Sequence, residues 1–330
     1  MKKKELLFFI ICVSSSVIAL LISISIGTTK INIINIIKNI FNNFTVDEID
    51  LYIIKSIRIP RALCAMLCGG ILSVSGLCFQ TVFKNPLADS YILGISSGAS
   101  FSVSLGLLLG LSINSVYSLP VIAFTGSLAT SFLLFFNGKK NINSMLLFGV
   151  AINFFLSACT SLFIFLGKKQ VQFVIYWTMG SLSSSSYLKA AIFTILSVFI
   201  LLFLLRRNKK MDLLLLNETT AFSLGINANK ERLLLLIVSS LTTSVIVAYC
   251  GVIGFIGLMC PHITRKFLGP KHKPLIICSF PLGALILQIS DIISRIVIPN
   301  SELPIGIITS IIGAPIFFSL LLKRKSTIYD

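Results

Sequence analysis

Residues 58–100 read "RIPRALCAMLCGGILSVSGLCFQTVFKNPLADSYILGISSGAS". The stretch holds one long apolar run, residues 60–82, and the beginning of a second, residues 93–111, on either side of the polar insert Lys84-Asn85-Pro86. An apolar run of about 20 residues with few charges is long enough to cross the hydrocarbon core of a bilayer as a helix. Because proline starts turns readily and interrupts helices, the insert predicts a tight polar turn between two membrane helices.

The same pattern of apolar runs and short polar breaks continues through the whole chain of 330 residues. Hydrophobic residues make up 55% of the sequence and charged residues only 12%, against roughly 25% charged residues in a soluble domain. We therefore expect an all-α, polytopic membrane protein that forms a single domain over residues 1–330. About ten transmembrane helices are predicted, at residues 6–27, 60–82, 93–111, 117–136, 144–166, 188–205, 233–250, 254–267, 274–297 and 305–322. The run 254–267 is short for a core about 30 Å thick, which predicts a half-depth helix packed inside protein.

The positive charge of the chain follows the membrane topology. The net charge is +17, from 28 Lys and Arg against 11 Asp and Glu. Lys and Arg gather in cytoplasmic loops and beside anionic lipid, so the surplus does not require a nucleic acid partner. With the N-terminus inside, 19 of these cations fall on the inner side and 9 on the outer side. This asymmetry predicts that both termini lie in the cytoplasm.

Three of the outward cations are arginines near helix ends. Arg58 and Arg61 flank Pro60, and Arg295 ends the run 274–297. An arginine at such a place can extend its side chain to the interface, or the three together can form an electropositive ring for an acidic partner. Asp291 lies four residues before Arg295, a spacing that predicts an ion pair on one helix face.

Two polar loops are long enough to hold structure of their own. The outer segment 28–57 predicts a short amphipathic helix on the outer surface. The inner loop, about residues 206–232, predicts two short helices joined at Gly225, where glycine permits a left-handed helix end. Asn217 or Thr219 can cap the first and Asn227 can begin the second. Such a loop is either a docking surface in the cytoplasm or a solvated connection shaped by its charges.

Motifs for catalysis and cofactor binding are missing from the sequence. No G-x-x-x-x-G-K-[ST] is present to hold a nucleotide phosphate, and no nucleophile, zinc or dinucleotide motif appears. All eight cysteines lie in apolar runs without a C-x-x-C pair, which favours buried small hydrophobes over metal ligands. Asp291 is the one acidic residue inside a predicted span, so an ion relay is not indicated. We expect no enzyme activity, no bound cofactor and no metal, with energy supplied by a separate subunit.

Small residues recur at spacings that allow helices to approach closely in lipid. Such contacts hold membrane helices together because hydrophobicity alone does not drive them to associate. The predicted packing positions are Gly69, Gly76, Gly94, Gly98, Gly254 and Gly257.

Three blocks of sequence together resemble one protein family. Residues 58–100 are similar to the successive patterns R-x-P-R, G-x-x-L-x-x-S-G-x-x-x-Q, N-P-L-A and L-G-x-x-x-G-A. Residues 251–269, "GVIGFIGLMCPHITRKFLG", are similar to the pattern G-x-I-x-F-[IV]-G-L-x-x-P-H-x-x-R. Residues 302–323, "ELPIGIITSIIGAPIFFSLLLK", and the inner-loop segment "ETTAFSLGI" follow in the expected order. On these motifs the chain resembles the FecCD-type permeases of ABC importers for iron–siderophore complexes, haem and vitamin B12.

The resemblance implies a type II ABC importer permease of the bacterial cytoplasmic membrane. Such permeases work as dimers, of two copies or of two sister permeases, with two cytoplasmic ATPase subunits that use ATP-Mg and an external substrate-binding lipoprotein. By resemblance, ATPase contacts fall at Glu218, Thr219, Ala221, Leu224 and Gly225, binding-protein contacts at Arg58, Arg61 and Arg295, and a cytoplasmic gate at Asn85 and Leu87.

The implied function is import of a bulky iron chelate, with a ferric siderophore favoured over haem or cobalamin. The alternative is a secondary transporter or channel that acts without an ATPase. The lack of intramembrane carboxylates other than Asp291 and the inner-loop motif disfavour that alternative.

Overall fold

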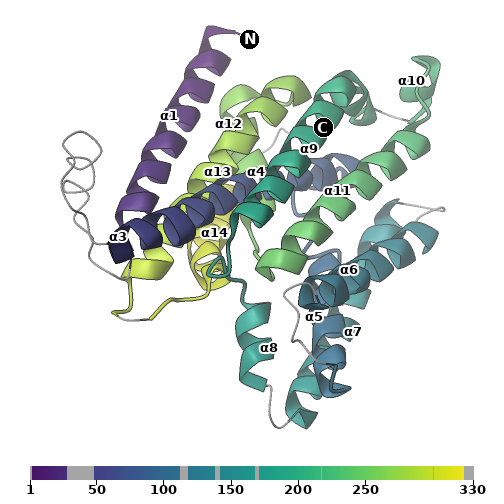
Figure 1. The fold of residues 1–330 in the computed structure, drawn as a ribbon. Coiled ribbons are helices and arrows are strands. Elements are labelled where there is room, and N and C mark those ends of the chain that lie inside the picture. The colour runs from purple at the N-terminus through teal and green to yellow at the C-terminus, as the bar shows by residue number, and fades with distance from the viewer. Residues whose placement is uncertain are drawn as a thin grey trace.

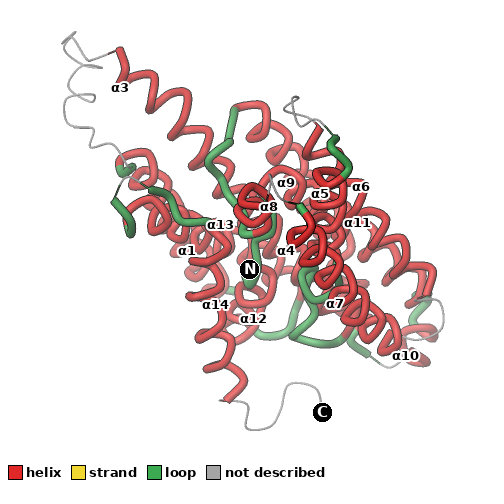
Figure 2. The backbone as a smooth tube through the Cα atoms, turned by 90° about the horizontal axis from the view of Figure 1, so that it is seen from below, coloured by secondary structure: helices red, strands yellow, loops and turns green. Residues whose placement is uncertain are grey.

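In a computed structural model of the chain, the described residues are 2–27, 48–111, 118–137, 142–167, 171–216, 218–299 and 301–322. Every regular element among them is a helix (Figures 1 and 2). The helices are α1 (Lys3–Ser25), α3 (Glu48–Tyr52), a π-helical segment η1 (Ile53–Arg58), α4 (Ile59–Phe83), α5 (Ile95–Leu108), α6 (Ser118–Asn137), α7 (Ile142–Leu166), α8 (Val171–Thr178), α9 (Tyr187–Leu214), α10 (Glu218–Ser223), α11 (Ala228–Cys250), α12 (Ile256–Leu268), α13 (His272–Ile296) and α14 (Ile305–Leu322).

Each of the ten predicted apolar runs forms a helix at the expected place. Among the described residues, seven helices are long and apolar enough to cross a membrane, and α5 and α14 are shorter apolar helices. The tenth, α12, has 13 residues, and its first six, Ile256–Pro261, are all buried. The prediction of a short helix packed inside protein at 254–267 is therefore confirmed.

Helix α4 lies at the centre of the bundle. It packs against α13, α9, α11 and α12 (Figure 1), and between Pro60 and Phe83 all residues but Leu63 and Met66 are buried. The polar side chains of this buried helix bond to their neighbours: Ser73 Oγ donates to Ser279 O at 2.7 Å, and Ser75 Oγ lies 3.2 Å from Thr242 Oγ1. Bonds of this kind satisfy polar groups that cannot reach water. Seven of the eight cysteines are also buried, as small hydrophobes.

Several predicted boundaries were wrong. Helix α9 continues to Leu214, so the first nine residues of the expected inner loop 206–232 are helical. Only one short helix, α10, follows, because Asn227 caps the long helix α11 instead of starting a second short one; its Oδ1 accepts from Lys230 N at 3.1 Å. Helix α8 was not predicted, since eight residues are too few for a span.

The outer segment can be compared with its prediction only in part. Residues 28–47 lie outside the described residues, and so does Asn217. Residues 48–58 are helical in α3 and η1 and lead directly into α4. Residues 48–58 therefore belong to one continuous helical stretch, Glu48–Phe83, and the surface helix expected within 28–57 stays a prediction.

Candidate functional site

The structure brings the three predicted docking arginines together at one end of α1, α4 and α13. Arg58 Nη1 donates to the carbonyls of Ile24 and Ser25, at 3.1 and 2.8 Å. Arg295 Nη1 donates to the carbonyls of Ser23 and Ile26, at 3.0 and 2.8 Å. The last carbonyls of a helix have no partner within the helix and carry the negative end of its dipole. Both arginines therefore stabilise the end of α1.

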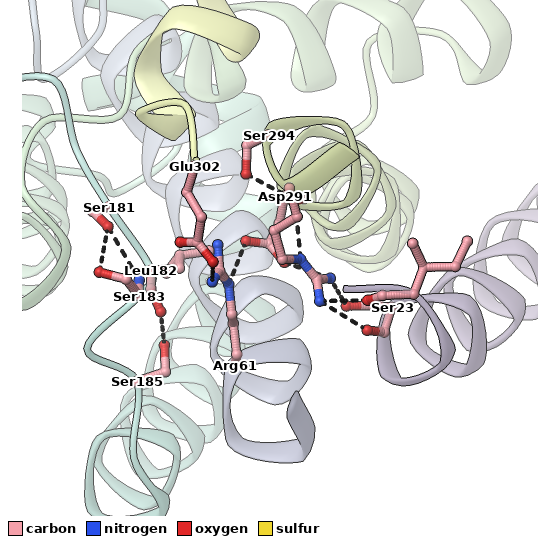
Figure 3. Close-up of polar contacts among 11 residues, drawn as sticks. Ser23, Arg61, Ser181, Leu182, Ser183, Ser185, Asp291, Ser294 and Glu302 are labelled. Atoms are coloured by element: carbon pink, nitrogen blue, oxygen red, sulfur yellow. Dashed lines mark hydrogen bonds and ion pairs between the residues drawn. The ribbon is translucent and has the colours of Figure 1, made fainter. Parts of the chain in front are cut away.

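Arg61 completes this cluster from the first turn of α4. Its Nε lies 2.9 Å from Asp291 Oδ1, and its Nη1 lies 2.7 Å from Glu302 Oε1 (Figure 3). Arg295 Nη2 is 2.9 Å from Asp291 Oδ2, so the predicted pair between Asp291 and Arg295 is confirmed. One buried carboxylate thus joins two guanidinium groups that come from different helices.

The burial of the arginines bears on their predicted role. Arg58, Arg61 and Arg295 are only 3%, 5% and 4% exposed. In this chain they hold α1, α4 and α13 to one another through charged and backbone contacts. Contact with an acidic binding protein stays a prediction, and such a partner would have to reach groups that already have partners.

The polar insert after α4 forms a compact turn. Lys84 ends α4 in a left-handed conformation, with φ +48°, and Leu87 N donates to Asn85 Oδ1 at 2.9 Å. Leu87 is 38% exposed, and Asn85 is half-buried. Lys84 Nζ donates to Leu216 O at 2.7 Å, beyond the end of α9 and two residues before α10. The predicted gate residues therefore lie in a turn that is bonded to the inner loop.

Asp89 lies within the same turn, and no role was predicted for it from the sequence. It is 4% exposed, and its Oδ1 accepts from Ser90 Oγ at 3.5 Å. A Cβ atom at Gly257 would come within 2.5 Å of this oxygen, so the carboxyl group packs directly on α12. Burial raises the pKa of Asp89 from an ordinary 3.8 to about 6, although hydrogen bonds from Ser90 oppose the rise. The turn thus carries a buried acid whose pKa is raised to about 6.

The inner loop lies far from the arginine cluster. Figure 1 shows α10 at the end of the molecule where α1 begins, whereas the arginines hold the other end of α1. Of the predicted coupling residues, Thr219 is exposed, Leu224 is 55% exposed and Ala221 is buried against the bundle. Gly225 ends the turn with φ +79°, a left-handed conformation that favours glycine. For Glu218 the structure gives only its place as the first residue of α10.

Phe222 is the most exposed apolar side chain of α10, at 77%. The base of the loop is fixed behind it: Lys210 Nζ bonds Glu231 Oε1 at 2.6 Å, and Arg207 pairs with the other oxygen of Glu231. These contacts join the end of α9 to the start of α11. A short apolar tip therefore projects from a firmly held base.

Most of the predicted packing glycines lie where helices meet. A Cβ atom at Gly69 would overlap the Gly283 carbonyl of α13, and one at Gly76 would overlap the Gly257 backbone of α12. At Gly98, an added Cβ would be 2.7 Å from the Gly126 carbonyl of α6. Gly94 starts α5 in a left-handed conformation, with φ +84°. Gly254 differs, because the described residues leave open space around it, and close packing does not explain this glycine.

Two buried polar networks had no local signal in the sequence. Gln80 Nε2 donates to the carbonyls of Gly257 and Leu258, at 3.2 and 3.1 Å, and ties α4 to α12. His272 Nδ1 lies 2.7 Å from Asp212 Oδ1, and its Nε2 lies 2.8 Å from Thr81 Oγ1, which joins α13, α9 and α4. Their partners are 60 to 191 residues apart in sequence. Among the described residues, no three His, Cys, Asp or Glu side chains lie together as a metal site would need.

Comparisons with known proteins agree with this arrangement. The model of the FecCD transport family matches residues 15–323. The chain is 35% identical to the "Probable iron chelatin transport system permease protein" of Helicobacter pylori (strain ATCC 700392 / 26695), over 95% of this chain and 96% of that protein. It is 33% identical to the hemin transport system permease protein HmuU of Yersinia pestis, over 93% of this chain and 94% of that one.

A solved structure of similar fold agrees with this family match. It is described as a metal-chelate type ABC transporter in an inward-facing conformation, and it superposes with a TM-score of 0.84. Its sequence is 29% identical, over 96% of this chain and 98% of that one. The chain belongs to the FecCD transport family. It is an ABC importer permease of the type II, metal-chelate class and spans the cell membrane.

Proposed function

We propose that this chain is the permease subunit of an ATP-driven importer that moves a ferric siderophore across the cytoplasmic membrane. Haem and cobalamin are the alternative cargoes. The permease pairs with a second copy or a sister permease, and a binding lipoprotein delivers the chelate to the end that carries Arg58, Arg61 and Arg295. The chain itself makes and breaks no covalent bond and binds no cofactor, because partner subunits hydrolyse ATP.

The observation that carries this proposal is the exposed apolar tip of the inner loop. Phe222 and Leu224 are 77% and 55% exposed, at the end of the molecule opposite the arginine cluster. Apolar side chains on a short, firmly based helix suit insertion into a cleft of another protein. We assign α10 and Gly225 to contact with the ATPase, at the cytoplasmic face together with both termini.

The bond between Lys84 and Leu216 suggests how motion reaches the pathway. Leu216 lies two residues before α10, and Lys84 begins the turn that contains Asn85 and Leu87. A displacement of α10 by the ATPase would therefore pull on the gate turn through this contact. Alternating access follows if the turn opens in one ATPase state and closes in the other.

Co-purification tests the ATPase assignment. The permease would be tagged and expressed with the candidate ATPase subunit of the same genome, as wild type, Phe222→Asp and Phe222→Leu. We expect wild type and Phe222→Leu to retain the ATPase and Phe222→Asp to lose it, because a charged tip resists burial in an apolar cleft. Full retention by Phe222→Asp would refute the assigned role of α10. Chelate uptake by the permease alone, without ATP, would favour the secondary transporter.

A further inference from the structure

A cavity of about 560 Å³ lies beside the arginine cluster, between the start of α6, helix α8 with the turn after it, the end of α11 and residues 302–304 just before α14. This volume falls in the range of small-molecule sites, roughly 300–1,000 Å³. Four aromatic side chains line it: Phe173, Tyr176, Trp177 and Tyr249. Phe173 and Tyr176 are 44% and 55% exposed, so flat faces are available to a ligand.

Backbone hydrogen bonds hold the walls of this cavity to one another. After α8, Ser181 N donates to Cys250 O at 2.8 Å, which fixes the turn to the end of α11. The start of α14 bonds the same turn, since Ile305 N donates to Gly180 O and Gly306 N to Met179 O, both at 3.0 Å. Because three elements are joined in this way, the cavity is formed before any ligand arrives.

The polar groups of the cavity are a lysine and several serine hydroxyls. Lys189 Nζ donates to Ser184 Oγ at 2.7 Å and lies 5.7 Å from the centre of the Tyr249 ring. Ser181 and Ser183 also line the cavity and form a tight turn, with their Oγ atoms 2.8 Å apart (Figure 3).

The charge of this lysine is not neutralised by the cavity itself. Among the described residues, no carboxylate lies within ion-pair distance of Lys189. Glu302 also lines the cavity, but Arg61 binds it at 2.7 Å and balances its charge. The cavity therefore offers aromatic faces, hydroxyl groups and one uncompensated positive charge.

We propose that this cavity binds an anionic metal chelate whose donor groups are aromatic. The inference rests on the proposed function and narrows its substrate class. Aromatic rings of the ligand would stack on Trp177 and Tyr249, its oxygens would accept from the serine hydroxyls, and its negative charge would face Lys189. Two cargoes share this chemistry, ferric catecholates and haem with its propionates. Hydroxamate chelates lack this chemistry, because they have neither aromatic rings nor negative charge.

Trp177 makes the binding directly measurable, because it is the one tryptophan in the chain. The wild-type permease in lipid nanodiscs would be titrated with three gallium(III) complexes, and tryptophan fluorescence recorded. The probes are the tris(2,3-dihydroxybenzoate) complex, the protoporphyrin IX complex and the desferrioxamine B complex, which is a cationic hydroxamate. We expect saturable quenching by the dihydroxybenzoate complex or by the protoporphyrin complex, and the one that responds identifies the cargo. The desferrioxamine B complex should cause no quenching. Equal response to all three, or to none, overturns the proposal.

Substitutions test whether the positive charge of Lys189 binds the ligand, and a control substitution shows whether a change elsewhere has the same effect. Lys189→Gln should weaken binding of the responding complex by about tenfold, as loss of one charge-assisted hydrogen bond implies, and Lys189→Arg should keep it. Lys55→Gln is the matched control, since Lys55 is exposed and its carbonyl accepts from Tyr187 Oη near the start of α9. Unaltered binding in Lys189→Gln, or equal loss in Lys55→Gln, contradicts the assignment.

Uptake distinguishes failure of this inference from failure of the proposed function. ATP-dependent uptake of the three complexes would be measured with the ATPase and binding protein present. If every complex enters equally well with wild type and Lys189→Gln, the importer stands and the cavity assignment falls. If no iron or gallium chelate enters with ATP, the proposed function itself fails.

Discussion

Arg61 Nε lies 2.9 Å from Asp291 Oδ1, and the two side chains are only 6% and 0% exposed. Asp291 also faces Arg295 at 2.9 Å, so a single carboxylate pairs with two buried cations, and Glu302 supplies Arg61 with a second carboxylate. Taking one partner from a buried ion pair leaves an uncompensated charge, which usually costs more than the pair contributes. The stability of this end of the bundle therefore depends strongly on Asp291.

Asp291→Asn should destabilise the permease by roughly 3–5 kcal/mol, the usual cost of breaking a buried ion pair. Glu302→Gln is the matched control, because its carboxylate also binds Arg61 but is 33% exposed. Glu302→Gln should lower the free energy of unfolding by about 1 kcal/mol or less. Thermal unfolding of the purified protein can be followed with a thiol-reactive dye, since seven of the eight cysteines are buried. Equal melting temperatures for the two variants would contradict this account of the cluster.

The helix contact between Gly76 and Gly257 predicts a second difference in stability. A Cβ atom at Gly76 would overlap the backbone of α12, whereas one at Gly254 meets open space among the described residues. Gly76→Ala should therefore destabilise the bundle by about 1–3 kcal/mol, as overpacking does, and Gly254→Ala should stay close to wild type. Melting temperatures of both variants test this, and a tolerated Gly76→Ala would show that α4 and α12 can separate without cost.

Asp89 predicts a pH effect. The folded protein keeps the proton on Asp89 up to about pH 6, while an ordinary aspartate releases it near pH 3.8. Between these values the folded state binds more protons than the unfolded state, so this group lowers stability as the pH rises. Asp89→Asn should remove that decline and raise the melting temperature at pH 7.5.

The control for this effect is the pH dependence itself. The difference in melting temperature between Asp89→Asn and wild type should be large at pH 7.5 and nearly gone at pH 4. A difference that stays constant across that range would mean that the variant acts through packing against Gly257 and not through its charge.

The sequence predicted the helices well because each depends on local composition. All ten apolar runs became helices, and the burial of α12 followed from its length alone. The end of α9 was missed because the polar residues 206–210 end the apolar run, and hydropathy marks where apolar character ends and not where a helix ends. Arg, Lys and Met are good helix formers, so the helix continues past the apolar run.

The site was less predictable because its contacts join distant residues. The pair Asp291–Arg295 could be foreseen from its spacing of four, whereas Arg61 and Glu302 are 241 residues apart. The sequence placed three arginines at one face but could not show that helix carbonyls and carboxylates bury them. In the same way, Asp212 and His272 carry no mutual signal until α9 and α13 are packed together.

The central claim is that ATP hydrolysis drives chelate import through the inner loop, and Gly225 tests it most directly. Gly225 has φ +79° with open space around it, so Gly225→Val strains the turn without a clash. Gly110→Val is the matched control, since Gly110 has φ +72°, equally open surroundings and a place outside the loop.

The measurement is uptake of radioactive ferric chelate into proteoliposomes that hold the permease, its ATPase and the binding protein, with ATP hydrolysis recorded in parallel. We predict ATP-dependent uptake by wild type and Gly110→Val, and in Gly225→Val continued hydrolysis with uptake reduced at least about tenfold, because the strained turn no longer transmits the ATPase motion. Unchanged coupled uptake in Gly225→Val, or wild-type uptake that needs no ATP, would contradict the account.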